Sequence, residues 1–166
     1  MKIFGLGFDM EQFKATDMNF SMMAPANKII FSITPIYNFR FEPEVGYYKI
    51  TEKESDLTSI SLSFGIGAPG MYQRNKVNIY GGLRFEYTVS TSEYTSTTTG
   101  NQTAENKGTT IGPVVGAEYL FSQHFSIGGE IGGKYSSLKT TNSQYSDDSE
   151  ASYILTQTGL FLRFYF

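Results

Sequence analysis

The sequence contains no cysteine, no tryptophan and a single histidine. The absence of cysteine excludes disulfides, thiol chemistry and zinc sites that use thiolates. No segment approaches the roughly 18 apolar residues of a membrane-spanning helix. Charged residues make up only 17% of the chain and the net charge is −3. A nucleic-acid binder held by a basic surface is therefore excluded, because affinity for phosphate requires clustered lysine and arginine.

The chain is rich in aromatic residues and glycine, with 14 Phe, 12 Tyr and 17 Gly among its 166 residues. This length predicts a single domain covering residues 1–166. The N-terminal stretch has neither the long apolar core nor the small-residue cleavage site of a signal peptide. We therefore expect either a cytosolic protein or one whose sequence begins after a removed signal.

Apolar residues alternate with polar or small residues along most of the chain, and no sustained helical stripe occurs. In the segment 125–135, Phe125 and Ile127 share one face, whereas Glu130 and Lys134 share the other. Such a period of two is typical of strands that have two different faces. We predict eight strands, at residues 2–12, 28–37, 39–53, 57–68, 76–92, 109–121, 125–141 and 152–166.

The predicted connections differ in length between the two ends of the strands. At one end they are long, apart from 54–56, and cover 14–27, 93–108 and 142–151. At the other end they are tight, at Asn38, at 68–75 and at 122–124. Pro69 and Gly70 supply a turn signal within the second of these. Hairpins joined in this way are typical of an up-and-down antiparallel meander.

The apolar face carries too many large side chains for the inside of an eight-stranded barrel, whose interior is just wide enough for side chains to fill. The opposite face combines glycine, serine and threonine with charged residues. A bilayer requires a closed barrel with apolar residues outside, and outer-membrane barrels have this alternation. We therefore predict an all-β fold, an eight-stranded antiparallel up-and-down transmembrane β-barrel. The alternative is a soluble ligand-binding barrel, with the apolar face inside.

Aromatic residues gather toward both ends of the predicted strands, as in the girdles of membrane barrels. The tight-turn end has Tyr37, Phe39, Tyr119, Phe121, Phe125 and Phe166, and the long-loop end has Tyr47, Tyr87, Tyr94, Tyr135 and Tyr153. Three prolines fall within predicted strands, where the missing N–H predicts a bulge or a lost ladder bond. These are Pro35, Pro43 and Pro113, and the last is expected to matter most.

Three segments carry a resemblance to a known family. They are Phe-Arg-Phe-Glu-Pro-Glu-Val-Gly-Tyr at 39–47, the glycine pairs at 81–82, 128–129 and 132–133, and the ending Gly-Leu-Phe-Leu-Arg-Phe-Tyr-Phe at 159–166. With them, the whole chain resembles the small eight-stranded outer-membrane barrels of Gram-negative bacteria, the OmpA/OmpX-like family. The resemblance implies a monomer in the outer membrane of a Gram-negative bacterium, in contact with outer-membrane lipid and lipopolysaccharide. It also implies that Phe164 and Phe166 form the assembly signal read by the barrel-assembly machinery.

The predicted inner face carries a structural network of charges in the lumen. Its members are Arg40, Glu42, Glu44, Arg84, Glu86, Glu118, Glu130, Lys134 and Arg163. Neighbouring strands suggest that Arg84 pairs with Glu118 and Arg163 with Glu130. When Asp9 and Glu11 are added, seven carboxylates face four cations. The network either plugs the barrel or lines a narrow path that favours cations, because three negative charges are in excess.

We predict no catalytic residue, no cofactor and no metal site. His124 and Ser126 superficially match the His-x-Ser of outer-membrane lipid A deacylases, but they fall at the tight-turn end, opposite to the catalytic end of those enzymes. Asp147, Asp148 and Glu150 are more typical of a solvated loop than of a calcium site.

The expected role is therefore structural or adhesive. An extracellular protein or surface partner would bind the loops 93–108 and 142–151, the first of which is rich in threonine and strand-forming. A mobile solvated loop is the alternative for 93–108, and the apolar segment 14–27 is expected to cover the barrel mouth or contact lipid. A narrow small-solute or ion channel and a lipid-modifying enzyme remain alternative functions.

Overall fold

The computed structural model describes residues 4–14, 27–36, 38–52, 57–96, 100–142 and 149–166. Nearly all of them lie in eight strands, β1 (Phe4–Lys14), β2 (Asn27–Ile36), β3 (Phe39–Glu52), β4 (Leu57–Arg74), β5 (Val77–Ser96), β6 (Gly100–Leu120), β7 (Phe125–Asn142) and β8 (Ser149–Tyr165). Consecutive strands pair antiparallel, and β1 also pairs with β8, so the sheet closes into a barrel. The predicted fold class is confirmed.

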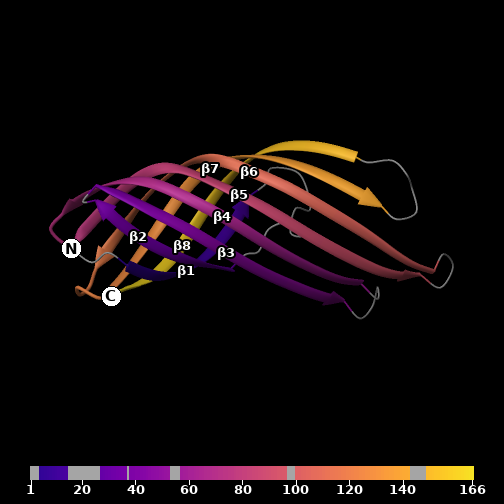
Figure 1. Cartoon of the computed structure of the whole chain (residues 1–166), viewed down its shortest axis with the longest axis horizontal. Coiled ribbons are helices and arrows are strands. Elements are labelled where there is room, and N and C mark those ends of the chain that lie inside the picture. Colours follow the sequence, from indigo (N-terminus) through magenta and orange to yellow (C-terminus); the bar gives the residue numbers. More distant parts are fainter. Residues whose placement is uncertain (1–3, 15–26, 37, 53–56, 97–99, 143–148) are drawn as a thin grey trace.

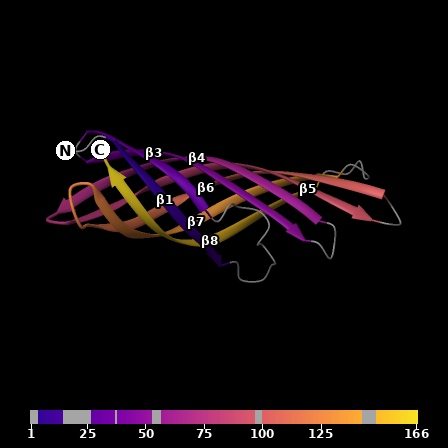
Figure 2. The same cartoon turned by 90° about the horizontal axis from the view of Figure 1, so that it is seen from below.

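All eight strands are inclined to the long axis of the molecule, as closure of a barrel requires (Figures 1 and 2). Phe4 and Phe166, the first and last described residues, meet at the tight-turn end, and β5 and β6 reach farthest from it. Among the described residues, no helix is long and apolar enough to cross a membrane. Closure leaves no free sheet edge in the barrel itself, so the backbone groups of the ring are paired within it except beside the strand prolines.

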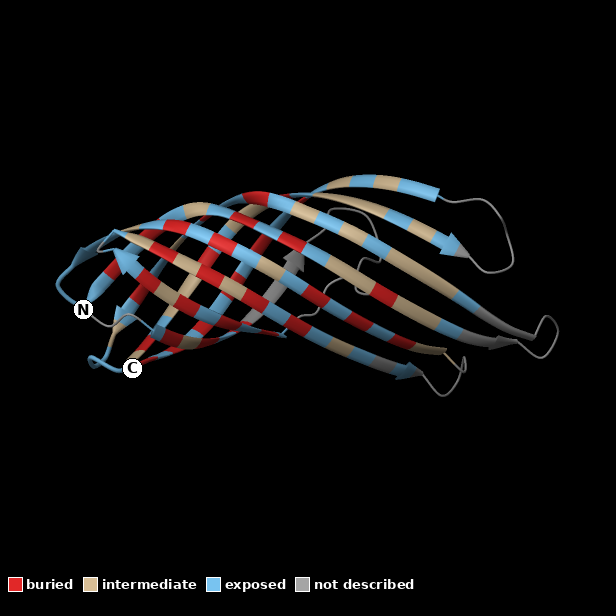
Figure 3. Ribbon diagram, viewed as in Figure 1, coloured by how far each residue is buried: buried red, intermediate tan, exposed pale blue. Residues whose placement is uncertain are grey.

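Burial alternates along the strands, with the charged face inside and the apolar face outside. In β8 the residues alternate between buried and exposed from Leu155 to Tyr165, and the same banding covers the closed part of the barrel (Figure 3). Glu42 and Arg163 are 0% exposed, whereas Leu83 is 57% exposed. A soluble barrel with an apolar core is therefore excluded, because its burial would be the reverse.

Aromatic side chains surround the barrel at both ends of the apolar surface. At the tight-turn end the rings of Tyr119, Phe121, Phe125 and Phe164 follow one another, with centroid separations of 5.1, 5.7 and 5.2 Å. At the other end Tyr47, Tyr87 and Tyr135 face outward and are exposed. Tyr153 is instead half-buried on the inner face, and the side chain of Tyr94 lies outside the described residues.

The predicted end of a strand at residue 68 is wrong, because β4 continues through Pro69 and Gly70 to Arg74. The turn follows at residues 75–76, and Asn75 has a φ of 55°, a left-handed conformation that asparagine tolerates. Pro69 pairs with Gly82 on β5. A Cβ on Gly82 would lie 2.5 Å from the Pro69 Cα, so this glycine allows the strand to pass the proline.

The three strand prolines disturb the ladder in the two predicted ways. Pro35 lies in a register shift between Ile33 and Ile36, which is a bulge. At Pro43 and Pro113 the pairing with one neighbouring strand is interrupted and then resumes in the same register. The flanking pairs are Ile33–Phe41 and Ile30–Glu44 at Pro43, and Ile111–Tyr135 and Val114–Gly132 at Pro113.

The barrel wall is much taller on one side than on the other. β5 and β6 have 20 and 21 residues, about twice the 9–11 that cross a bilayer. The segment 93–108, predicted as a loop, is therefore mostly paired strand, in accordance with the strand propensity of threonine. Residues 97–99 and 143–148 lie outside the described residues, as does the apolar segment 15–26.

Candidate functional site

Glycine on the inner face leaves space for long charged side chains in the lumen. A Cβ on Gly65 of β4 would overlap the carboxylate of Glu44. A Cβ on Gly67 would lie 2.8 Å from Nη1 of Arg84. Because an eight-stranded barrel is just filled by side chains, these glycines of β4 leave room for charged side chains of the neighbouring strands β3 and β5.

The part of the network nearest the tight turns is centred on Glu118. The guanidinium groups of Arg40 and Arg163 both donate to its carboxylate, the latter at 2.9 Å. Asn78 donates from Nδ2 at 2.7 Å and the Tyr165 hydroxyl at 2.9 Å. Glu118 is 1% exposed, so its charge is compensated by these donors rather than by bulk water.

Arg84 occupies the middle of the lumen and joins three carboxylates. Its Nε and Nη2 donate to the two oxygens of Glu130 at 2.8 and 2.7 Å, a bidentate arrangement. The same guanidinium donates to Glu42 at 2.7 Å and to Glu44 at 3.1 Å. The Tyr80 hydroxyl also donates to Glu130, at 3.0 Å.

On the long-loop side of Arg84, two lysines form ion pairs with Glu86. The ammonium groups of Lys28 and Lys134 lie 2.7 and 3.2 Å from the same oxygen of Glu86. Lys28 also lies 3.4 Å from Glu44, and Arg163 lies 2.8 Å from Glu42. These contacts connect the three levels into one ion-pair network that fills the lumen.

The network brings together all nine residues that the sequence assigned to the lumen, but the predicted partners are wrong. Arg84 pairs with Glu42, Glu44 and Glu130 rather than with Glu118. Arg163 pairs with Glu42 and Glu118 rather than with Glu130. The reason is register, because Arg84 lies opposite Gly112 on β6 and its side chain extends across the lumen.

Sequence reasoning missed Lys28, which is 2% exposed. The alternation of faces could have predicted its position, because Lys28 shares a face with Ile30 and Ser32 at the start of a predicted strand. With Lys28 included, six buried carboxylates face five buried cations among the described side chains, so the excess is one negative charge rather than three. The side chain of Glu11 lies outside the described residues.

Three aromatic side chains, which the alternation places on the inner face, were not expected to contact the charge network. The Arg163 guanidinium lies 3.8 Å from the centroid of the Phe161 ring and 5.5 Å from that of Tyr80. Arg40 lies 5.9 Å from the centroid of Tyr165. Stacking of this kind favours arginine over lysine at these positions, because a guanidinium packs flat on a ring.

The structure separates the candidate catalytic pair. His124 is exposed in the turn before β7, and its Nδ1 lies 3.0 Å from the Tyr165 carbonyl oxygen. Ser126 is 0% exposed inside the barrel, where its hydroxyl donates to Glu118. Among the described residues, no group of three His, Cys, Asp or Glu could hold a metal ion. Asp147 and Asp148 lie outside those residues.

The two residues of the predicted assembly signal lie at the tight-turn end. Phe164 faces outward and belongs to the aromatic row, with its ring centroid 5.2 Å from that of Phe125. Phe166 is 70% exposed, and its backbone N–H donates to the Phe4 carbonyl at 3.0 Å. The C-terminal phenylalanine is thus hydrogen-bonded to β1, the strand with which β8 closes the barrel.

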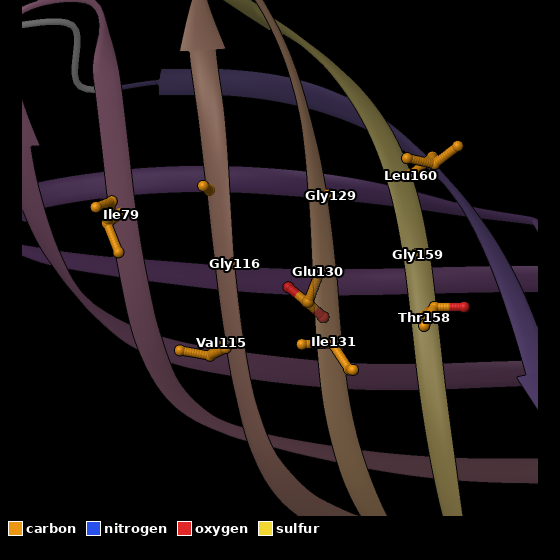
Figure 4. Close-up of a pocket in the computed structure, with 10 residues that line it drawn as sticks. Ile79, Val115, Gly116, Gly129, Glu130, Ile131, Thr158, Gly159 and Leu160 are labelled. Atoms are coloured by element: carbon orange, nitrogen blue, oxygen red, sulfur yellow. The ribbon is translucent and has the colours of Figure 1, made fainter.

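A hollow lies over the apolar wall on the outer surface: a groove of about 660 Å³ over β5–β8. Its floor is formed where Ala117 and Gly129 face each other across β6 and β7. Ile79 and Leu160 stand beside them on the flanking strands (Figure 4). The groove lies on the apolar exterior, in contrast to the ion-pair network in the lumen.

A closed ring of eight strands with an apolar exterior, aromatic girdles and a charged interior defines a transmembrane β-barrel of the outer-membrane class. Two solved structures share the fold. A major outer membrane protein from Thermus thermophilus matches with a TM-score of 0.61 and 11% identity, covering 99% of this chain and 98% of that one. Neisserial surface protein A matches with a TM-score of 0.55 and 13% identity, covering 98% and 97%.

No known family profile matches the chain, and no curated protein matches its sequence. The shared feature is thus the fold, which confirms the predicted resemblance to small outer-membrane barrels. The predicted outer-membrane location follows from this fold together with the apolar exterior of the barrel.

Proposed function

We propose that this chain is a non-enzymatic outer-membrane barrel that binds an extracellular protein or surface through the sheet that extends above the membrane. The observation that carries the proposal is the uneven height of the barrel wall. β3 to β8 continue beyond the level at which β1 ends and β2 begins. A tall sheet of this kind presents a surface that membrane insertion does not need.

The extension has the surface of a segment that lies in water. Outward positions of β5 change from Phe85 and Tyr87 to Thr91 and Glu93. On β6, Lys107 is exposed and lies 3.0 Å from Glu105. Because charged and hydroxyl side chains are unfavourable in hydrocarbon, this part of the sheet belongs outside the bilayer.

One edge of the extension can accept a further strand. Tyr47–Glu52 of β3 pairs with β4, and among the described residues nothing pairs with its other side, because β2 begins at Asn27 and its pairing ends at Gly46. An edge with unpaired N–H and C=O groups can take up an extended peptide by strand addition. The partner that fits is therefore a protein with an extended segment.

The test is a shortened hairpin. Ser90 pairs with Asn106, so residues 91–105 can be replaced by an Asn-Gly turn without changing the register below. Gram-negative cells that display the full chain are expected to adhere several-fold more to an epithelial monolayer than cells that display the shortened chain. Equal heat-modifiable mobility in SDS gels controls for folding. Equal adherence of the two would assign binding to the β3 edge, which the shortened chain keeps, rather than to the hairpin, and no adherence by the full chain would contradict the proposal.

The proposed lumen is a plug rather than a path. The ion-pair network fills the interior from Glu118 to Glu86, which supports a barrel that does not conduct. Planar-bilayer recordings are expected to show no conductance steps from the wild-type chain. Steps with a preference for cations would favour the alternative, a narrow channel.

The proposal also includes the absence of turnover. His124 is exposed at the tight-turn end, away from the extension, which supports a barrel without lipid hydrolysis. Released fatty acid that disappears in His124→Ala would favour a lipid-modifying enzyme instead.

The remaining proposed partners are those that a protein in an outer membrane would contact. We propose a monomer in contact with lipid and lipopolysaccharide, with Phe164 and Phe166 acting as the signal for the barrel-assembly machinery. Removal of Phe166 is expected to slow assembly in cells while leaving refolding of the purified chain in detergent unchanged. Equal slowing in both settings would assign Phe166 to the stability of the barrel rather than to recognition.

A further inference from the structure

The groove over β5–β8 interrupts an exterior on which most side chains are bulky. Phenylalanine, isoleucine and leucine cover most of the outward positions, but the floor of the groove is Ala117 and Gly129. A Cβ on Gly129 would meet only the Gly159 oxygen at 3.5 Å and Leu160 at 3.6 Å, which are ordinary contacts. The barrel backbone therefore does not require glycine here, and the hollow is a feature of the outer surface.

The groove lies at the depth of one leaflet of the bilayer. Its floor lies two residue pairs above the pair Tyr119–Ile127, and Tyr119 belongs to the aromatic row at the tight-turn end. Aromatic girdles lie at the level of lipid headgroups. The groove therefore begins just inside the hydrocarbon of the leaflet on the tight-turn side and continues toward the bilayer centre along Val115 and Ile131.

The charged side chains on the tight-turn side of the groove indicate which kind of lipid headgroup would lie there. Among the described residues at the tight-turn end, Arg74 and Lys76 carry the exposed side-chain charges, and no exposed side chain there is acidic. Lys76 precedes Ile79 by three residues, which is roughly 10 Å along a strand. Cations at this distance from an acyl-chain groove attract the phosphate of an anionic lipid.

We propose that this groove holds one acyl chain of an anionic phospholipid from the leaflet on the tight-turn side, with its phosphate beside Lys76 and Arg74. The side chains that line an empty groove lack van der Waals contacts on one side. A flexible acyl chain can fill such an irregular groove. The volume of about 660 Å³ falls in the range of roughly 300–1,000 Å³ that small-molecule sites occupy.

A second copy of the chain is a poorer occupant than a lipid. A two-fold contact brings the same patch of both copies together, and here the patch is hollow. Gly129 of one copy would face the equivalent hollow of the other, so the void would remain. Lipid chains have no fixed shape and fill the groove without this restriction.

The experiment uses the full chain in phosphatidylcholine bilayers that contain a trace of spin-labelled phosphatidylglycerol or spin-labelled phosphatidylcholine. The motionally restricted fraction of each label reports binding to the barrel. Gly129→Phe fills the groove, and Gly133→Phe is the matched control on the same strand and face, since a Cβ on Gly133 meets nothing within 4 Å. Gly129→Leu is a smaller filling variant in case phenylalanine prevents folding.

The wild type and Gly133→Phe are expected to prefer phosphatidylglycerol by roughly fivefold over phosphatidylcholine. Gly129→Phe and Gly129→Leu are expected to lose about one restricted lipid per barrel, together with the preference. Lys76→Gln with Arg74→Gln is expected to abolish the preference but keep the restricted chain. Equal lipid binding by the Gly129 and Gly133 variants would overturn the proposal. Cross-linked dimers that disappear only in Gly129→Phe would also overturn it, in favour of a second copy.

Discussion

Replacing Arg84 with methionine leaves one carboxylate in the lumen without a cation. Glu42 keeps Arg163 at 2.8 Å, and Glu44 keeps Lys28 at 3.4 Å. Among the described side chains, Glu130 forms an ion pair with Arg84 alone, and it retains only the hydroxyl of Tyr80 as a donor. The variant therefore removes one well-defined compensation rather than the whole network.

The expected cost is that of one uncompensated buried charge. Breaking a buried pair by removing one partner costs about 3–5 kcal/mol, whereas an exposed pair contributes about 0–1 kcal/mol. Glu130 is 6% exposed, so the larger value applies to Arg84→Met. Adding Glu130→Gln removes the remaining charge and is expected to restore about 2 kcal/mol of the free energy of unfolding.

The assay is reversible unfolding in urea from phospholipid vesicles, followed by far-ultraviolet circular dichroism and by mobility in SDS gels. The free energy of unfolding is extrapolated to zero urea for the wild type, both single variants and the double variant. A loss below about 1 kcal/mol in Arg84→Met, or no rescue by Glu130→Gln, would refute the view that these buried charges depend on each other.

Two further substitutions test the barrel wall with the same assay. Gly112→Ala brings a Cβ onto the backbone oxygen of Gly133 and is expected to cost about 1–3 kcal/mol, whereas Gly133→Ala faces open space and is expected to leave the unfolding free energy unchanged. A neutral Gly112→Ala would mean that β6 and β7 are farther apart than described. Leu83→Lys places a charge on the apolar exterior and is expected to cost about 2–4 kcal/mol, while Thr91→Lys, above the apolar surface, is expected to cost nothing. Equal costs for these two lysines would contradict the proposed membrane boundary.

The strand count and the assignment of faces could be predicted because both depend only on a period of two. This period survives errors in where a strand ends, so Glu130 and Leu83 fell on the correct faces. Strand ends were harder to predict. Pro69 and Gly70 have the composition of a turn, and only the neighbouring Gly82 shows why β4 passes through them.

The ion-pair partners could not be predicted because they depend on the register and on contacts across the lumen. A residue such as Arg84 meets side chains from β3 and β7, which are not its neighbours in the sheet. The groove on the exterior was missed for a related reason. Ala117 and Gly129 are ordinary strand residues in the sequence, and only their pairing across β6 and β7 makes a hollow.

The central claim is that the apolar residues of this barrel face lipid. The most direct test is nuclear Overhauser contact between lipid acyl chains and labelled methyl groups of the chain in nanodiscs. The methyl groups of Leu83, Ile131 and Leu162, which are 57%, 55% and 40% exposed, are expected to contact lipid, whereas those of Ile30 and Val114, at 0% and 4%, are not. Lipid contacts to Ile30 and Val114, with Leu83 and Ile131 contacting only protein, would contradict the account.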